Sequence, residues 1–371
     1  MEKVKTKKSI NVFKIIIQGA LFLSILGITF GHILENNSLT EIKAAVRESS
    51  PLYLFFAIII MSLFFLGESI NIVRGLRITG NEVSIAQGMK YAITGFFFSS
   101  ITPSSSGGQP MQLYQMYKDR IPAGQGTLAL LLEFISYQTV TVVLACIGLI
   151  VLWNRIVETM GEQWIFLFIG FLLNFVTMIG VYLLLFCPRV FDILRKWNFI
   201  ERRLGSCITE YQNGALVIRQ NSSKIFPFLF TTTIQMLAMY SVPYFVYASY
   251  GFHAYHWIDI ILLQSVLYVS VSALPIPGAI GVSESGFIKL FRILFPVELL
   301  SGAMILSRGI SFYLYLFVTG MICAVMIIFP YHNDRILNRQ KNNPTSKLPG
   351  GLSILLTLNY LYVITCSGMV P

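Results

Sequence analysis

The stretch PIPGAIGVSESG, residues 275–286, interrupts an otherwise apolar segment that runs from Trp257 to Phe295. Its two prolines end a helix because proline lacks the backbone N–H group that the helix needs. Ser283 then has the residue type that caps the start of a second helix, and Glu284 would lie in the first turn of that helix. The stretch therefore predicts two half-helices joined by a break, rather than one continuous helix.

The chain around this stretch has 371 residues, of which 55% are hydrophobic and 12% are charged. A soluble domain contains roughly a quarter charged residues, and a disordered chain has low hydrophobicity, so the composition excludes both classes. The 27 basic residues exceed the 17 acidic residues, which gives a net charge of +10. In a membrane protein this excess favours basic cytoplasmic loops and contacts with anionic headgroups over nucleic-acid binding.

Several apolar segments are about 20 residues long, which is the length that a helix needs to cross a hydrocarbon core. We predict six full crossings: Phe13–Gly31, Leu52–Val73, Thr127–Leu152, Trp164–Phe186, Ile225–Ser249 and Gly302–Phe329. The first of these is expected to be an uncleaved anchor, because no small-residue cleavage site follows it. Two weaker stretches, Val83–Ile101 and Trp257–Phe295, contain polar residues or helix breakers. The basic tail 336–371 has a short apolar run whose role is left open.

The distribution of charge decides how the two weaker stretches are arranged. If both crossed the membrane, the loop 188–224 would lie outside with seven Lys and Arg residues, against the positive-inside rule. If both instead enter and return on one side, that loop and the basic N-terminus are cytoplasmic. The outer loops then hold Lys43, Arg47 and Arg155. We therefore predict two re-entrant hairpins in a multi-pass protein of the cytoplasmic membrane.

This arrangement has an internal symmetry. Residues 13–152 would form two crossings, a hairpin entering from inside and a further crossing, and residues 164–329 would repeat that order with a hairpin entering from outside. Such inverted repeats, with broken segments at corresponding positions, are typical of transporters that bind substrate near the bilayer midplane. We expect an all-α polytopic fold, with residues 1–335 as one integral membrane domain.

The breaks in both hairpins contain small residues that could bind a phosphate. In the run TPSSSGGQP, residues 102–110, the backbone N–H groups of Gly107 and Gly108 are candidates, although a plain loop fits this composition equally well. Gly278 and Gly281 are the corresponding candidates in the second break.

Ionisable residues in the apolar segments supply further candidates, since a charge at the bilayer centre must be paired or hydrated. Glu68 shares a helical face with Asn71 and Gly75. Similarly, Glu133 shares a face with Ser136 and Tyr137, and Arg308 with Ser311 and Tyr315. These stripes should face one another or an aqueous cavity. For some candidates a structural role competes: Arg74 as an end anchor, Glu133 as an interfacial residue and Glu284 as a partner of the helix dipole.

No pattern for soluble catalysis is present in the sequence. It contains no Walker A motif, no nucleophile elbow and no dinucleotide-binding glycine motif. The five cysteines and four histidines are scattered without the spacing of a metal site. We therefore expect no metal, no cofactor and no catalytic residue.

Two of these motifs resemble signatures of the lysylphosphatidylglycerol synthase membrane-region family, also called flippase-like. They are PIPGAIGVSE at residues 275–284, and ITPSSSGG at residues 101–108 followed by Tyr114 and the KDR cluster at 118–120. Glu133 after three leucines, and Arg74, are similar to the family's glutamate and arginine. The resemblance covers roughly residues 10 to 335. It implies the lipid-moving part of a synthase, without the aminoacyl-transfer domain that follows the membrane region in full-length synthases.

The leading hypothesis is a lipid flippase that moves an anionic or aminoacylated phospholipid, or a polyprenyl-phosphate-linked sugar. The four glycines would bind the phosphate. Glu68, Glu133 and Glu284 would favour a cationic aminoacyl group or carry coupling protons, while Arg74 and Arg308 would balance charge. Ser283 joins the same candidate site. Two alternatives are a phosphatidylglycerol lysyltransferase, whose partner would be lysyl-tRNA, and a non-catalytic scaffold for an envelope enzyme. A homo-oligomer is compatible with each hypothesis.

Overall fold

The computed structural model describes residues 39–102, 105–161, 164–186, 216, 222–272 and 279–328. Every regular element in these ranges is a helix. Four helices are long and apolar enough to cross a membrane, and they span Pro51–Ile78, Ala123–Met160, Ser223–Ser249 and Val297–Met326. The expected all-α, multi-pass membrane architecture is therefore supported. The predicted crossing Phe13–Gly31, residue Gly278, the tail 336–371 and nearly all of the basic loop 188–224 lie outside the described residues.

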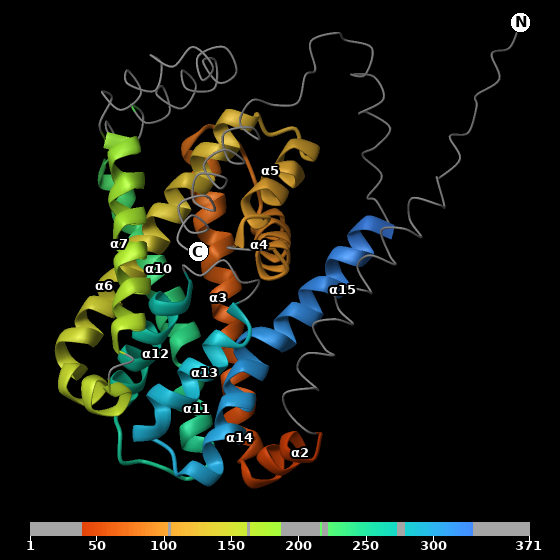
Figure 1. Cartoon of the computed structure of the whole chain (residues 1–371). Helices are drawn as coiled ribbons and strands as arrows, with labels where there is room; N and C mark the ends of the chain where they lie inside the picture. Colours follow the sequence, from red (N-terminus) through yellow and green to blue (C-terminus); the bar gives the residue numbers. More distant parts are fainter. Residues whose placement is uncertain are drawn as a thin grey trace, which may run out of the picture.

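The long helices pack together in a bundle (Figure 1). They are α3 (Pro51–Ile78), α6 (Ala123–Met160), α7 (Trp164–Phe186), and the consecutive pair α10 (Phe226–Tyr240) and α11 (Val242–Ser249). In Figure 1, α3 and α7 stand nearly upright and α6 runs obliquely. The short 3-10 helix η3 (Ser222–Ile225) leads into α10. Helix α7 has the predicted bounds, whereas α3 and α6 extend beyond theirs.

One helix was not expected from the sequence. Helix α2 (Leu39–Glu48) lies where the sequence suggested only an outer loop, and it packs against α14 (Val297–Arg308). Ala45 of α2 is buried in this contact, and its carbonyl accepts a hydrogen bond from the Tyr250 hydroxyl (3.5 Å). A helix of ten residues is too short to cross a membrane, so the length of its apolar run does not reveal it in the sequence.

The first weak stretch forms a helical hairpin, here called the first hairpin, from α4 (Ile85–Ser100) and α5 (Gly108–Lys118). The two helices run antiparallel. Gly95 faces Gln112, and Gly108 near the tip lies against Ser99. A Cβ atom on Gly108 would come within 1.9 Å of the Ser99 hydroxyl, so the absence of a side chain there allows the hairpin to close.

The second weak stretch forms the second hairpin, from α12 (Trp257–Ser272) and α13 (Val282–Leu290), which continues into the 3-10 helix η5 (Phe291–Ile293). Gly286 of α13 lies against Leu267 of α12. The prediction that Ser283 caps α13 is wrong, because Gly281 occupies the N-cap position. Its φ of +85° is a conformation that glycine adopts easily and serine does not.

The two hairpins enter the bundle from opposite ends. The Ser50 N–H group donates to the Ser249 carbonyl (2.8 Å), so α3 begins where α11 ends, and α12 starts from that same end. At the other end of α3, Asn81 donates to Gln125 (2.7 Å), and α4 starts there. We call these the Ser50 end and the Asn81 end. Figure 1 shows α4 and α5 in the upper half of the bundle and α13 in the lower half.

The last described span is not a uniform α-helix. After α14 the chain makes a π-helical segment, Gly309–Tyr313, before α15 (Leu314–Ile328). A π turn inserts an extra residue and rotates all later side chains around the axis. The predicted stripe of Arg308, Ser311 and Tyr315 is therefore interrupted. The Tyr315 hydroxyl instead contacts the Ser62 hydroxyl (2.7 Å) and the Ile58 carbonyl (2.8 Å) of α3.

Candidate functional site

Glu284 is the centre of a polar cluster at the base of the second hairpin's returning helix. One carboxylate oxygen accepts hydrogen bonds from the Gly281 N–H group (2.5 Å) and the Ser283 hydroxyl (3.2 Å). The other oxygen accepts from the Arg308 Nε (3.0 Å) and the Tyr313 hydroxyl (2.8 Å). Glu284 thus both caps α13 and connects it to the π-helical turn that follows α14.

The ion pair between Glu284 and Arg308 is largely shielded from the surroundings. The exposed fraction is 14% for the Glu284 side chain and 18% for the Arg308 side chain. The guanidinium of Arg308 also lies over the ring of Phe312, 4.5 Å from its centroid. Because Tyr313 is five residues after Arg308, the wider π turn is what brings its hydroxyl to the same carboxylate.

A second acidic cluster lies between α3, α5 and α6. Gln112, a buried residue of the first hairpin, donates to the Glu68 carboxylate of α3 (3.1 Å). Helices α3 and α6 pack together, and Glu133 of α6 interacts electrostatically with Glu68 of α3. The first hairpin reaches this cluster through Gln112.

Tyr268 of α12 connects the two clusters. Its hydroxyl is hydrogen-bonded to that of Tyr137 on α6, and it interacts electrostatically with Glu68, Glu133 and Arg308. Both hairpins therefore contribute polar groups to the interior, Gln112 to the cluster of Glu68, and Tyr268 and Glu284 on the side of the second hairpin. We call this polar part of the interior the interhairpin seam, and we define it by Glu68, Gln112, Glu133, Tyr137, Tyr268, Glu284, Arg308 and Tyr313.

Gln235 of α10 is a buried amide that lies beside the seam. The residue is 1% exposed, and neither polar atom of its side-chain amide has a hydrogen-bond partner among the described residues. It packs against Gly67, the neighbour of Glu68 in sequence. Buried polar atoms in folded proteins are almost always satisfied, and ordered water or a ligand is the usual partner when the protein supplies none.

The candidate glycines differ in what their N–H groups do. The Gly107 N–H group donates to the Thr102 hydroxyl (2.8 Å), and the Gly281 N–H group donates to Glu284. In this conformation neither is available to a phosphate, because each already satisfies a side chain of its own hairpin. Gly108 is the first residue of α5 and lies at the tip of the first hairpin.

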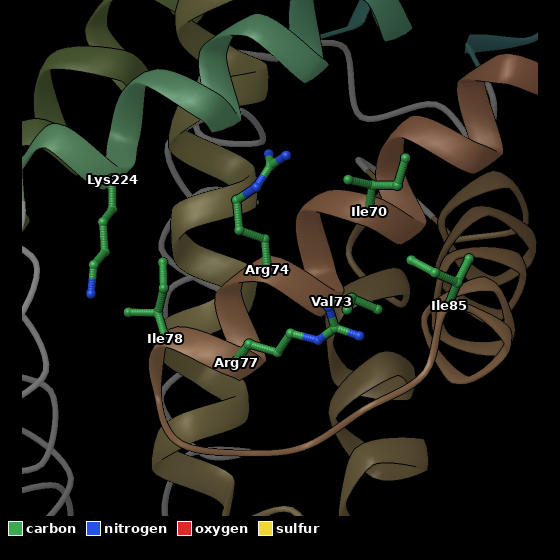
Figure 2. A pocket seen from close by; sticks show the side chains of 7 residues that line it. All are labelled: Ile70, Val73, Arg74, Arg77, Ile78, Ile85 and Lys224. Atoms are coloured by element: carbon green, nitrogen blue, oxygen red, sulfur yellow. The ribbon is translucent and has the colours of Figure 1, made fainter.

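Arg74 belongs to a different part of the molecule from the seam. It donates to the Asn71 side chain (2.8 Å), the Pro227 carbonyl (2.8 Å) and the Thr231 hydroxyl (3.0 Å). These contacts connect the last turns of α3 to the start of α10. Figure 2 shows Arg74 beside Arg77 and Lys224 in a pocket at the Asn81 end. Arg74 thus joins α3 to α10, and its predicted roles as an end anchor or as a charge in the lipid site stay predictions.

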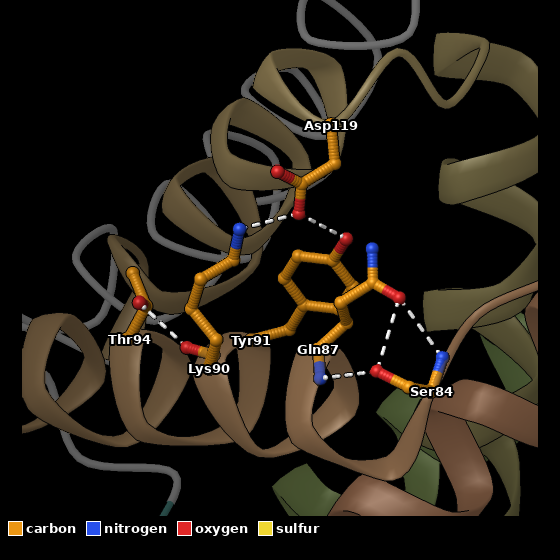
Figure 3. Close-up of polar contacts among 6 residues, drawn as sticks. All are labelled: Ser84, Gln87, Lys90, Tyr91, Thr94 and Asp119. Carbon is orange, nitrogen blue, oxygen red and sulfur yellow. Dashed lines mark hydrogen bonds and ion pairs between the residues drawn. The ribbon is translucent and has the colours of Figure 1, made fainter. Parts of the chain in front are cut away.

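The open end of the first hairpin is closed by a polar cluster that sequence reasoning missed. Lys90 and the Tyr91 hydroxyl of α4 both reach Asp119, which ends α5 (Figure 3). In the same view, Ser84 and Gln87 form a capping box at the start of α4. The S-x-x-Q spacing was a readable signal for the cap. Nothing local in the sequence indicates the Asp119 cluster, because its partners are about 30 residues apart.

Both hairpins and most of the long apolar helices around them lie within a region that matches one protein family. Residues 15–319 match the family described as the lysylphosphatidylglycerol synthase TM region. The chain belongs to this family. The match includes both hairpins and every residue of the seam. A comparison with curated proteins found no match.

Membership of the lysylphosphatidylglycerol synthase TM region family agrees with the resemblance seen in the PIPGAIGVSE and ITPSSSGG motifs. The structure adds residues that those motifs do not contain, chiefly Gln112, Tyr268 and Tyr313. Among the described residues, no group of three or more His, Cys, Asp or Glu side chains is arranged to hold a metal ion. The seam contains the ion pair of Glu284 and Arg308, the carboxyl groups of Glu68 and Glu133, the Gln112 amide and three tyrosine hydroxyl groups.

Proposed function

We propose that the chain translocates a lipid with a polar headgroup across the cytoplasmic membrane, and that the headgroup passes through the interhairpin seam. The observation that carries this proposal is that each hairpin brings a polar group to a partner inside the bundle, Gln112 to Glu68 and Glu284 to Arg308. A charged group inside a membrane protein is costly unless it is paired or hydrated, so such groups usually mark a binding or transport site.

In the proposed topology the two helical hairpins are re-entrant, and the chain crosses the membrane six times with a cytoplasmic N-terminus. Their entry from opposite ends of the bundle supports this inverted arrangement. Lys43, Arg47 and Arg155 all belong to the Ser50 end, and Arg155 lies over the Tyr255 ring there. Lys289 and Arg292 are also near that end, so the asymmetry of charge depends on the N-terminus and the loop 188–224.

The charges of the seam favour an aminoacylated phospholipid over a purely anionic one. The seam contains three carboxyl groups, Glu68, Glu133 and Glu284, and one guanidinium, Arg308, which pairs with Glu284, so a cationic group would find more acidic than basic partners there. A lysyl headgroup supplies ammonium groups that these carboxylates can bind, while Arg308 can bind the phosphodiester. Alternatively, the carboxylates accept the protons that drive transport.

Movement of one repeat against the other would expose this headgroup to each side in turn. The bonds of Glu284 to Arg308 and Tyr313 lie between the second hairpin and the segment that ends α14 and begins the π-helical turn, so they are the contacts that this motion would change. Release of the Gly281 N–H group from Glu284 would also make it available to a phosphate.

The direct test uses purified protein in proteoliposomes that contain lysylphosphatidylglycerol. A membrane-impermeant amine reagent measures the fraction of this lipid in the outer leaflet over time. We expect wild-type protein to exchange the lipid faster than empty vesicles, and Glu68→Gln to abolish most of the gain. Glu158→Gln is the matched control, because this glutamate is exposed near the end of α6.

Exchange no faster than in empty vesicles would overturn the proposal. In cells, Glu68→Gln and Glu284→Gln should both abolish the lipid-dependent phenotype. A phenotype that survives both substitutions would instead favour the scaffold hypothesis, since a scaffold does not need the charges of the seam.

A further inference from the structure

A second site with a different charge lies away from the seam, at the Asn81 end. It is a pocket of about 350 Å³ lined by Ile70, Val73, Arg74, Arg77, Ile78, Ile85 and Lys224 (Figure 2). Three of the seven residues are cationic, the other four are apolar, and none is acidic. From these observations we propose that the pocket binds the phosphodiester of an anionic phospholipid, separately from the lipid that the seam handles.

The pocket lies at the depth in the membrane where lipid headgroups are expected. Arg74 and Arg77 lie near the C-terminal end of one apolar span, Pro51–Ile78, and Lys224 lies at the start of another, Ser223–Ser249. The ends of apolar spans mark the boundary between hydrocarbon and headgroups, where Lys and Arg bind anionic lipids. Basic pockets between membrane helices at this depth are the usual form of such sites.

The cations retain capacity to bind a phosphate. Arg77 and Lys224 are exposed, and the hydrogen bond from Arg77 to the Val83 carbonyl (2.9 Å) uses one of its five N–H donors. Arg74 is fixed at the edge of the pocket by its contacts with α10. The one acidic residue of the loop between α3 and α4, Glu82, does not line the pocket.

The apolar lining fits the rest of a phospholipid rather than a free anion. Ile70, Val73, Ile78 and Ile85 surround the cations, and a glycerol backbone with the first carbons of its acyl chains would cover them. Inorganic phosphate has the same charge chemistry but no apolar part. A volume of about 350 Å³ is near the lower limit for small-molecule sites, which suits a headgroup with its chains outside the pocket.

The test measures binding of a fluorescent phosphatidylglycerol to the full chain in nanodiscs of phosphatidylcholine. We expect the double variant Arg77→Gln/Lys224→Gln to weaken binding by about tenfold or more, because each basic residue near the surface contributes substantially to anionic lipid binding. The control Lys43→Gln/Arg47→Gln removes the same charge from two exposed positions of α2 and should leave binding within about twofold. Lipid exchange through the seam should continue in both double variants.

Three results would overturn the proposal. Equal weakening in both double variants would mean that net charge alone attracts the lipid. Displacement of the fluorescent lipid by inorganic phosphate at equal concentration would assign the pocket to a free anion. Unchanged binding in a folded Arg77→Gln/Lys224→Gln protein would exclude the pocket itself. If the double variant does not fold, Lys224→Gln alone, at an exposed position, should still weaken binding by about threefold or more, and unchanged binding would contradict the proposal.

Discussion

The two oxygens of the Glu284 carboxylate have different roles. One satisfies the N–H group of Gly281 at the start of α13, and the other pairs with Arg308 and Tyr313. The sequence presented the helix-dipole role and the functional role of this residue as alternatives. The structure shows that local capping and tertiary pairing coexist, because a carboxylate has enough lone pairs for both.

Glu284→Gln tests the energetic part of this arrangement. The amide keeps the size and an acceptor for Gly281, but it removes the negative charge beside a largely buried guanidinium. We expect the free energy of unfolding to fall by about 2 kcal/mol, less than for a fully buried pair because both side chains are partly exposed.

The measurement is chemical or thermal unfolding of purified protein in detergent. Glu298→Gln is the control, since this exposed glutamate in the first turn of α14 should contribute less than about 1 kcal/mol. Equal stability of the two variants would mean that the ion pair contributes nothing to the fold.

Helix packing in this protein depends on a few glycines at close contacts. A Cβ atom on Gly88 of α4 would lie 2.6 Å from the Ser69 hydroxyl and 2.7 Å from the Ser69 carbonyl of α3. The Ser69 hydroxyl could rotate away from such a Cβ atom, but the Ser69 carbonyl belongs to the backbone and cannot. Gly88 therefore sets the distance between the first hairpin and α3, which carries Glu68.

Gly88→Ala should consequently push α4 away from α3 and reduce the free energy of unfolding by about 1–3 kcal/mol. Gly180→Ala in α7 is the matched control, because in the part of the chain that the structure describes nothing beyond its own chain neighbours and helix backbone lies within 4 Å of the position its Cβ would take. It should be neutral or stabilising by up to about 1 kcal/mol. Unfolding measurements that found the two substitutions equivalent would contradict the close packing of α3 and α4.

The π-helical segment Gly309–Tyr313 decides which tyrosine belongs to the seam. Tyr313→Phe should reduce lipid exchange several-fold, because it removes a hydrogen bond to Glu284. Tyr315→Phe should cost about 1 kcal/mol of stability through its lost contact with α3 and should leave exchange unchanged. A uniform α-helix would predict the reverse, so the exchange rates of the two variants distinguish the registers.

At the scale of the whole molecule, the sequence predicted the helix–break–helix segments and four long apolar helices, because hydrophobic runs and proline breaks are local signals. It also placed Glu68 and Glu133 on polar helix faces, which were expected to face one another or an aqueous cavity. It could not predict the partnership of Glu284 with Tyr313, because a π turn has no recognised local signature. Gln112 and Gln235 were not predicted, because the role of a neutral polar residue in a helix depends on which residues of other helices it contacts.

The central claim is that the two hairpins enter from opposite sides of the membrane and meet at the seam. The most direct measurement introduces single cysteines into a chain whose five native cysteines have been replaced, and labels them on intact cells with a membrane-impermeant maleimide. The positions are Glu82, before the first hairpin, and His253, before the second; both are exposed. We predict that His253→Cys is labelled from outside and that Glu82→Cys is labelled only after the cells are opened. Labelling of both cysteines from the same side would contradict the account.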